Sequence, residues 1–319
     1  MTKNTNRRTF IKNTSILMAA TAGTGPAALR NMGMKPKFRI CLNPGNIGAS
    51  FDQETLLNMA IKYGYQAINP NVKALAVMSD AERESYLEKM KNNDITWGSA
   101  GLPVDFRNDE KKYRDDIVGL ATAAETLASV GVTRMNTWIM PSNELYTYNE
   151  NFKLHRNRLR EAANIIGHYG IRLGLEYVGP KTLLTRSKYS FIRTMAEGKE
   201  LIAAMGEPNV GFVLDSFHWY CAGDTTTDLL TLENKDVVVV DLNDARSGLS
   251  VDEQIDGQRE LPMATGVIPM ADFMQALKQI DYDGPIRAEP FNQPLRDMDD
   301  EQAVKVTYDA MKKAYDLAH

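Results

Sequence analysis

Short apolar runs alternate with longer amphipathic segments from residue 38 to the end of the chain. Brief runs rich in Val, Ile, Leu and Phe, bounded by Gly, Pro or polar residues, are typical of buried β-strands. We therefore predict eight strands, over residues 38–42, 66–69, 95–99, 133–138, 171–177, 210–215, 237–242 and 285–289.

The segments between these runs repeat their apolar positions every three to four residues, which is typical of helices with one buried face. We predict helices over residues 53–63, 80–91, 111–129, 146–169, 190–204, 226–232, 270–280 and 299–317. Strict alternation of strand and helix implies parallel strands, because parallel neighbours need a crossover connection.

Eight such units over about 280 residues predict an α/β fold of the (β/α)8 TIM barrel type, in a single domain. The alternative is an open, doubly wound sheet. The first strand is not followed by the Gly-rich turn with which such sheets bind dinucleotides, and this absence favours the barrel.

The first residues of the chain have a different character. No acidic residue precedes Asp52, and the stretch 6–12, Asn-Arg-Arg-Thr-Phe-Ile-Lys, resembles a twin-arginine export motif. A weakly apolar run follows over 15–29, too short and polar to span a bilayer. We expect 1–28 to be a removed export signal, 29–37 a linker and 38–319 the barrel, with a periplasmic location; the alternative is a merely basic terminus.

Charge and composition narrow the possible functions. The chain has 37 Lys and Arg against 41 Asp and Glu, a net charge of −4, and loss of the basic leader would leave about −8. Such a body lacks the cationic surface that nucleic-acid binding needs. Two Cys exclude a disulfide framework, and four His leave carboxylates as the main ligands for any metal.

Four acidic residues close four successive predicted strands. Glu176, Asp215, Asp241 and Glu289 each follow a mainly apolar run and precede a polar loop. In a barrel this is the C-terminal mouth, where functional groups lie. Four converging carboxylates would repel one another, and a divalent metal is the usual remedy. Each acid by itself also fits a helix N-cap.

Side chains alternate along a strand, which predicts what lies beneath these acids. If Glu176 points into the barrel, so does Gly174, while the flanking leucines face the helices. The same count places Val237 and Val239 inside with Asp241. A site made only of oxygen ligands prefers Mn²⁺ or Mg²⁺, with Co²⁺ or Zn²⁺ possible.

Several motifs resemble the xylose isomerase-like sugar isomerase and epimerase barrels. They are Gly-Leu-Glu-Tyr-Val-Gly-Pro-Lys-Thr at 174–182, Asn-Val-Gly-Phe-Val-Leu-Asp-Ser-Phe-His at 209–218, Asp-Leu-Asn-Asp-Ala at 241–245, and Asp-Tyr-Asp-Gly-Pro at 281–285 with Ala-Glu-Pro-Phe at 288–291. The resemblance implies a metal held by Glu, Asp, His and Glu. Glu176, Asp215 and Glu289 match this set, whereas Asp241 stands where the family has His.

The resemblance also implies proton abstraction next to a sugar carbonyl, with Glu176 and Glu289 as the acid–base pair. His218 could contact a sugar oxygen, assist proton transfer or serve the loop structurally. The other candidates for substrate binding each have an ordinary alternative role. These are Arg259 (an exposed arginine), Trp138 (a core aromatic), Lys181 (a solvated lysine) and Asn43 (a turn residue).

The sequence thus predicts a metal-dependent isomerase or epimerase for an unphosphorylated sugar, because the mouth is acidic and export separates the protein from cytosolic sugar phosphates. A 3-keto-glycoside lyase or hydrolase would begin with the same proton abstraction and stays open. So does a non-catalytic envelope sugar-binding protein. The expected partners are a small sugar and the twin-arginine export machinery, with a homo-oligomer also possible.

Overall fold

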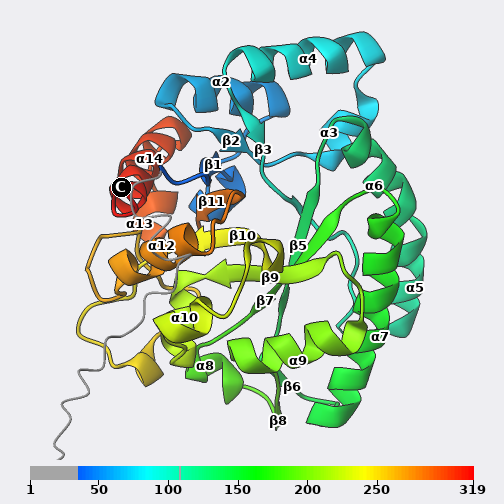
Figure 1. Ribbon diagram of the computed structural model, residues 1–319, viewed down its shortest axis with the longest axis vertical. Helices are drawn as coiled ribbons and strands as arrows, with labels where there is room; N and C mark the ends of the chain where they lie inside the picture. Colours follow the sequence, from blue (N-terminus) through cyan, green and yellow to red (C-terminus); the bar gives the residue numbers. More distant parts are fainter. Residues whose placement is uncertain (1–34, 108) are drawn as a thin grey trace, which may run out of the picture.

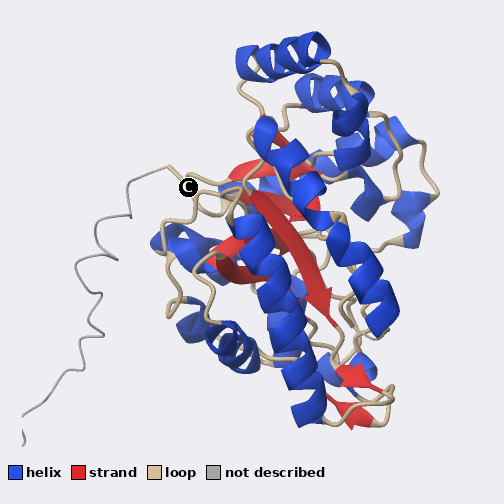
Figure 2. Ribbon diagram, turned by 90° about the vertical axis from the view of Figure 1, so that its right-hand side faces the viewer, coloured by secondary structure: helices blue, strands red, loops and turns tan. Residues whose placement is uncertain are grey.

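The computed structural model describes residues 35–107 and 109–319. The predicted export signal, residues 1–28, lies outside this part of the chain. Strands occupy the centre and helices surround them (Figure 1). A view from the side shows helices covering the outer face of the sheet (Figure 2). Among the described residues, no helix combines the length and the apolar character that a membrane span requires.

Nine parallel strands form the main sheet, in the order β3-β2-β1-β11-β10-β9-β7-β5-β4. The two ends of this order, β3 and β4, are separated in the chain only by Gly98 and Ser99, so the sheet closes on itself through this segment. The eight-strand barrel is therefore confirmed. Its strands are β1 (Arg39–Leu42), β2 (Ala67–Ile68), β3 (Thr96–Trp97) with β4 (Ala100–Gly101), β5 (Arg134–Ile139), β7 (Arg172–Tyr177), β9 (Val210–Asp215), β10 (Val237–Leu242) and β11 (Pro285–Ala288).

The strand predicted over 95–99 is in fact split, because β3 pairs with β2 and β4 pairs with β5. A Cβ on Gly98 would lie 2.6 Å from Cys41 Sγ and 2.3 Å from Asn69 Oδ1. Glycine therefore permits a close approach where the chain passes from one neighbour strand to the other.

The outer layer of helices follows the predicted order with local differences. Its members are α2 (Gln53–Tyr63), α3 (Val72–Val77), α4 (Asp80–Asn92), α5 (Glu110–Val118), α6 (Leu120–Ser129), α7 (Tyr148–Gly167), α8 (Lys181–Leu184), α9 (Met195–Met205), α10 (Ser216–Ala222), α11 (Thr226–Leu229), α12 (Met270–Gln279), α13 (Gln293–Arg296) and α14 (Asp300–Asp316). Short 3-10 turns complete it: η1 (Pro44–Ile47), η2 (Asn234–Asp236) and η3 (Val251–Glu253).

Capping explains where the predicted helix limits were right and wrong. Helix α2 has the predicted limits, because the Asp52 side chain accepts the Thr55 N–H and Gly64 closes the helix at φ 86°. The helix predicted over 111–129 breaks at Gly119, a poor helix former. The helix predicted from 190 begins only at Met195, where Thr194 forms a capping box, and the preceding β8 (Tyr189–Ser190) pairs with β6 (Ser142–Asn143).

The barrel interior is narrow beneath the acidic residues. A Cβ on Gly174 would meet Val213 Cγ2 at 2.9 Å and Val238 Cβ at 3.1 Å, which confirms that this glycine faces inward. Val213, Val238 and Val239 form the inner apolar cluster, whereas Val237 packs with the outer core. The prediction that Val237 points inward was wrong, because a register irregularity between Val237 and Val239 shifts the alternation.

Candidate active site at the mouth of the barrel

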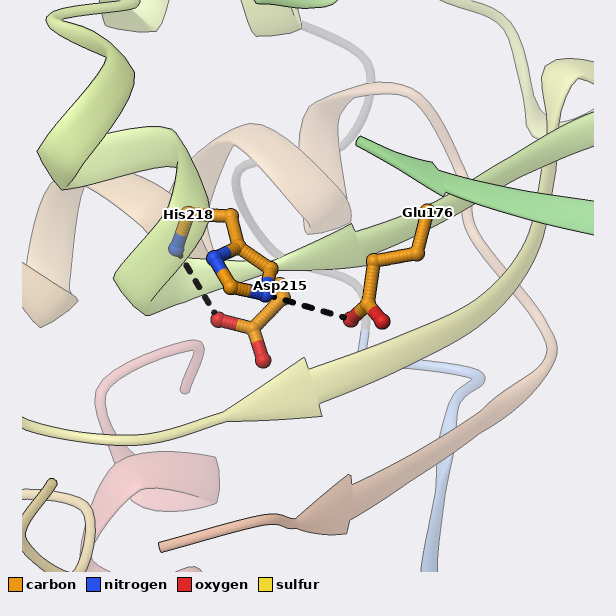
Figure 3. A group of neighbouring side chains, drawn as sticks. All are labelled: Glu176, Asp215 and His218. Atoms are coloured by element: carbon orange, nitrogen blue, oxygen red, sulfur yellow. Dashed lines mark hydrogen bonds and ion pairs between the residues drawn. The ribbon is translucent and has the colours of Figure 1, made fainter. Parts of the chain in front are cut away.

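The four acidic residues predicted at strand ends do converge. Glu176, Asp215, Asp241 and Glu289 each offer a carboxylate oxygen within 4.8 Å of those of the other three. Asp215 and Asp241 are each 1% exposed and Glu176 is 8% exposed, while the Glu289 side chain is 14% exposed. A second group joins Glu176 and Asp215 to His218, and Figure 3 shows these three side chains pointing toward one another.

Strand register is what brings these groups together. Asp215 on β9 lies opposite Asp241 on β10, and Asp241 lies opposite Arg287 on β11. Partners in a parallel register project to the same face of the sheet, so all three side chains point into the barrel mouth. Glu176 on β7 has Trp138 on β5 as its register partner, which directs this aromatic ring to the mouth as well.

Asp215 has a structural role as well as a place in the cluster. Its Oδ1 accepts the backbone N–H groups of Phe217 (2.6 Å) and His218 (3.1 Å), so it caps α10. Its Oδ2 accepts from Asn243 Nδ2 (2.8 Å) and Arg259 Nη1 (2.9 Å). The N-cap alternative and the site hypothesis therefore both apply to this residue, through different oxygens.

His218 is fixed by this cap in the first turn of α10. Its Nδ1 accepts the Gly179 N–H at 3.3 Å, and its Nε2 lies 3.9 Å from Glu176 Oε1 and 3.1 Å from Arg259 Nη2. Burial, followed by the nearby Arg259 charge, lowers the pKa of His218 to about 3. The imidazole is therefore neutral at physiological pH and can exchange hydrogen bonds without adding charge.

Arg259 lies at the centre of the site, although its exposed fraction is only 2%. Its Nη1 donates to Asp215 Oδ2 (2.9 Å) and Glu289 Oε2 (3.2 Å), and its Nη2 donates to Asp256 Oδ1 (2.6 Å). The guanidinium lies 4.9 Å from the Phe217 ring centroid and 4.7 Å from that of Phe291. The alternative of an ordinary exposed arginine was wrong.

A second buried arginine pairs with Asp241. Arg287 Nε donates to Asp241 Oδ1 at 2.5 Å and its Nη2 donates to Oδ2 at 2.9 Å, a bidentate arrangement. Its Nη1 donates to Ser99 Oγ at 2.9 Å. For both arginines burial opposes the charge, but the adjoining carboxylates raise the pKa further, so both guanidinium groups stay charged.

The pKa values of the carboxyl groups reflect their burial and their closeness to one another. Burial, then the Glu289 charge, raises the pKa of Glu176 well above its ordinary value. Burial, then Asp241, raises the pKa of Glu289 to about 8, and burial raises that of Asp215 to about 6 although Arg259 opposes the shift. Glu176 Oε1 is buried without a hydrogen-bond partner. An unpartnered buried carboxylate oxygen within a set of hard oxygen donors fits a divalent cation.

Two cavities adjoin the cluster. One, of about 510 Å³, is lined by apolar residues and by polar ones that include Asn43, Ser99, Asn136, Arg287 and Glu289. The other, of about 810 Å³, lies on the Arg259 side and includes Phe291. Asn43 therefore lines the first cavity, and the several amide side chains there can form hydrogen bonds with the hydroxyl groups of a ligand.

Comparison with known proteins identifies the family. The family model for the xylose isomerase-like TIM barrel matches residues 57–314. The chain belongs to this family. An inosose isomerase of Bacillus velezensis is 24% identical over 274 residues, covering 84% of this chain and 94% of the relative.

Two solved structures share the fold of this chain. A xylose isomerase domain protein from Alicyclobacillus acidocaldarius superposes with a TM-score of 0.76 at 28% identity, covering 89% of this chain and 99% of the other. The IolI protein, solved with a zinc atom bound, superposes with a TM-score of 0.73 at 21% identity, covering 88% and 99%. The second likeness, at this identity, shows the shared fold.

The two remaining predicted contacts differ in their position. Trp138 is 42% exposed, and the Arg107 guanidinium lies 4.0 Å from its ring centroid, so the alternative of a packed core aromatic was wrong. Lys181, in α8, forms an ion pair with Asp252 in η3, and its side chain is half exposed. This ion pair directs the amine toward η3, whereas Trp138, the register partner of Glu176, stays partly exposed.

Sequence reasoning overlooked Arg287, Asp256 and Asn243. Arg287 lies two residues before Glu289, so strand alternation places both on the inner face, and a buried inward arginine requires an acidic partner. Asp256 lies three residues before Arg259, in the loop after β10. Asn243 links two strands, because its amide donates to Asp215 and its Oδ1 accepts the Glu289 N–H at 3.0 Å. Asn243 lies within the motif at 241–245, but the motif does not reveal these two contacts.

The raised pKa of Glu289 predicts how stability depends on pH. Between its ordinary value of 4.5 and about 8, the folded state holds a proton that the unfolded state releases. The free energy of unfolding of the metal-free protein therefore falls as pH rises, by up to about 1.4 kcal/mol per pH unit for this group. Glu289→Gln removes this contribution, which urea unfolding in EDTA across the interval would show. The exposed Glu84→Gln is the control, and an unchanged slope in Glu289→Gln would contradict the assignment.

Proposed function

We propose that the protein is a metal-dependent isomerase or epimerase of an unphosphorylated sugar or sugar derivative. The observation that carries this proposal is the convergence of four carboxylates, with Glu176 Oε1 buried and unpartnered, beside a cavity whose lining includes several amide side chains. The similarity to inosose isomerases, although low in identity, supports the same class of reaction.

The residues that would hold the cation are carboxylates of the cluster, namely Glu176, Asp215 and Glu289, which match the ligands that the family resemblance implies. A divalent cation bound there, Mn²⁺ or Mg²⁺ by preference for oxygen ligands, would stabilise the negative charge that develops on a substrate carbonyl oxygen. Its charge would also favour ionisation of the neighbouring carboxyl groups, because an adjacent opposite charge lowers a carboxyl pKa.

Glu176 and Glu289 are the residues that would move the proton. They lie on β7 and at the end of β11, with β9 and β10 between them, so they reach the same centre from different sides of the mouth. One carboxylate removes the proton from the carbon next to the carbonyl, and the other returns it to that carbon or its neighbour. In the metal-free protein, burial and the neighbouring carboxylates raise the pKa of both groups.

Neighbouring side chains supply binding and orientation. Neutral His218 and charged Arg259 lie beside the acid–base pair, and the exposed part of the Trp138 ring can stack on a sugar ring. Asn43 lines the polar cavity on the other side of Glu289. The concentration of carboxylates at the centre disfavours a phosphorylated substrate, because like charges would meet in a buried site.

The proposed reaction is tested with a panel of ketoses, aldoses and 3-keto-glycosides in deuterated water. We expect deuterium to enter the substrate next to the carbonyl, EDTA to abolish the exchange, and Mn²⁺ to restore it. Glu289→Gln should lower the exchange rate by at least about a hundredfold, the usual size of a general acid–base contribution. The exposed Glu84→Gln should leave the rate unchanged.

The other outcomes of the same panel decide between the alternatives. Release of the aglycone from a 3-keto-glycoside would replace the isomerase proposal with a lyase. Sugar binding that survives EDTA, without exchange on any substrate, would indicate a non-catalytic sugar-binding protein. Exchange that continues in Glu289→Gln would remove this residue from the acid–base pair.

We further propose that the twin-arginine export machinery delivers the folded protein to the periplasm, on the basis of the motif at 6–12. Expression in a bacterial host that has this pathway should give a periplasmic protein without residues 1 to about 28, as measured by mass spectrometry of the mature N-terminus. Replacing Arg7 and Arg8 with Lys should retain it in the cytoplasm. A mature chain that still begins near Met1 would contradict cleavage.

A further inference from the structure

We infer that Asp241 does not coordinate the cation of the proposed site, and that Arg287 holds it as a permanent ion pair while Glu176, Asp215 and Glu289 bind the metal. The inference rests on the proposed function, since it concerns the cation assigned there. It assigns Arg287, which sequence reasoning overlooked, the role of a positioning residue.

Both oxygens of Asp241 are already engaged by one guanidinium. Oδ1 accepts from Arg287 Nε and Oδ2 from Arg287 Nη2, at 2.5 and 2.9 Å. Asp241 is 1% exposed and Arg287 3% exposed, so water cannot replace either partner. Bidentate pairing of this kind is strong and directional, and breaking it in a buried place leaves an uncompensated charge.

The surroundings of Arg287 keep this pair in place. The remaining hydrogen bonds of Arg287 are from Nη1 to neutral groups, Ser99 Oγ at 2.9 Å and the Asn136 side chain. If Asp241 turned to a cation, the guanidinium would keep its charge beside that cation without its bidentate carboxylate partner. Repulsion between the two positive charges would oppose the change.

The other three carboxylates are held differently. Glu176 Oε1 has no hydrogen-bond partner. Asp215 and Glu289 share Arg259, but this arginine has its own carboxylate partner in Asp256 at 2.6 Å and a further acceptor in the Asp256 backbone carbonyl at 2.9 Å. Arg259 can therefore release Asp215 and Glu289 to a cation and remain paired, whereas Arg287 cannot release Asp241 in this way.

A series of variants in which the charged pair is removed in two steps tests the inference through Mn²⁺ binding, without any substrate. Asp241→Leu removes the carboxylate and leaves Arg287 unpaired, so the Mn²⁺ affinity measured by calorimetry should fall by about tenfold or more through repulsion. Adding Arg287→Met replaces the whole pair by apolar side chains of similar volume, and the affinity should return to within about threefold of wild type. Asp215→Asn is the control in which a ligand is lost.

The rescue is what separates a positioning pair from a ligand. If Asp241 coordinates the metal, the double variant stays as weak as Asp215→Asn, which would overturn the inference and leave the proposed function standing. A wild-type protein that binds no Mn²⁺ would overturn both. Circular dichroism and thermal unfolding check that each variant is folded.

Crystals of the wild-type protein grown with Mn²⁺ give an independent measurement if the double variant does not fold. Anomalous scattering from the metal should place it within about 2.3 Å of oxygens of Glu176, Asp215 and Glu289, the usual range for hard-cation ligands. The Asp241–Arg287 hydrogen bonds should be retained. A metal–Asp241 oxygen distance in the same short range would contradict the inference.

Discussion

Mutual repulsion among four buried carboxylates is the constraint on which the rest of this barrel mouth depends. Unit charges 4.8 Å apart repel by about 3 to 4 kcal/mol at an effective dielectric constant of about 20, and the cluster contains several such pairs. The four carboxyl groups therefore cannot all be ionised at once unless positive charges lie nearby. Two buried guanidinium groups and raised carboxyl pKa values are the two responses that the structure shows.

The two buried arginines have different roles because they lie at different positions. Arg287 lies in strand register with Asp241 and forms a neutral unit with it, in the place where the family resemblance implies a neutral histidine. Arg259 comes from the loop after β10 and bridges Asp215, Glu289 and Asp256. Once Asp241 is paired with Arg287, three carboxylates of the cluster remain. Arg259 neutralises only part of their charge, and a divalent cation would neutralise the rest.

Much of the fold was predictable because barrel strands and helices have clear hydrophobic periods. The limits of β9, β10 and α2 match the predicted ranges. The errors came from local geometry that the hydrophobic periodicity does not indicate. They are the split between β3 and β4 at Gly98, the helix break at Gly119, and the register irregularity that turns Val237 outward. Each depends on contacts with a neighbouring strand or on a single cap, so the segment's own pattern could not reveal it.

The site was predictable in part for a similar reason. Strand-end position was enough to bring Glu176, Asp215, Asp241 and Glu289 together, because parallel strands deliver their C-terminal residues to one rim. The partner of each acid was not predicted, because it depends on side chains that come from neighbouring strands and loops. Arg287 reaches Asp241 across a strand pair, and Asn243 joins Asp215 to the Glu289 backbone.

The central claim is that this cluster is a binding site for one divalent cation. Calorimetric titration of the metal-free protein with Mn²⁺, repeated in two buffers of different ionisation enthalpy, measures both the stoichiometry and the protons released. The account predicts one ion per chain and net release of protons near neutral pH, because Glu289, whose pKa is raised to about 8, holds a proton until the cation binds. The absence of saturable binding, or binding without proton release, would contradict it.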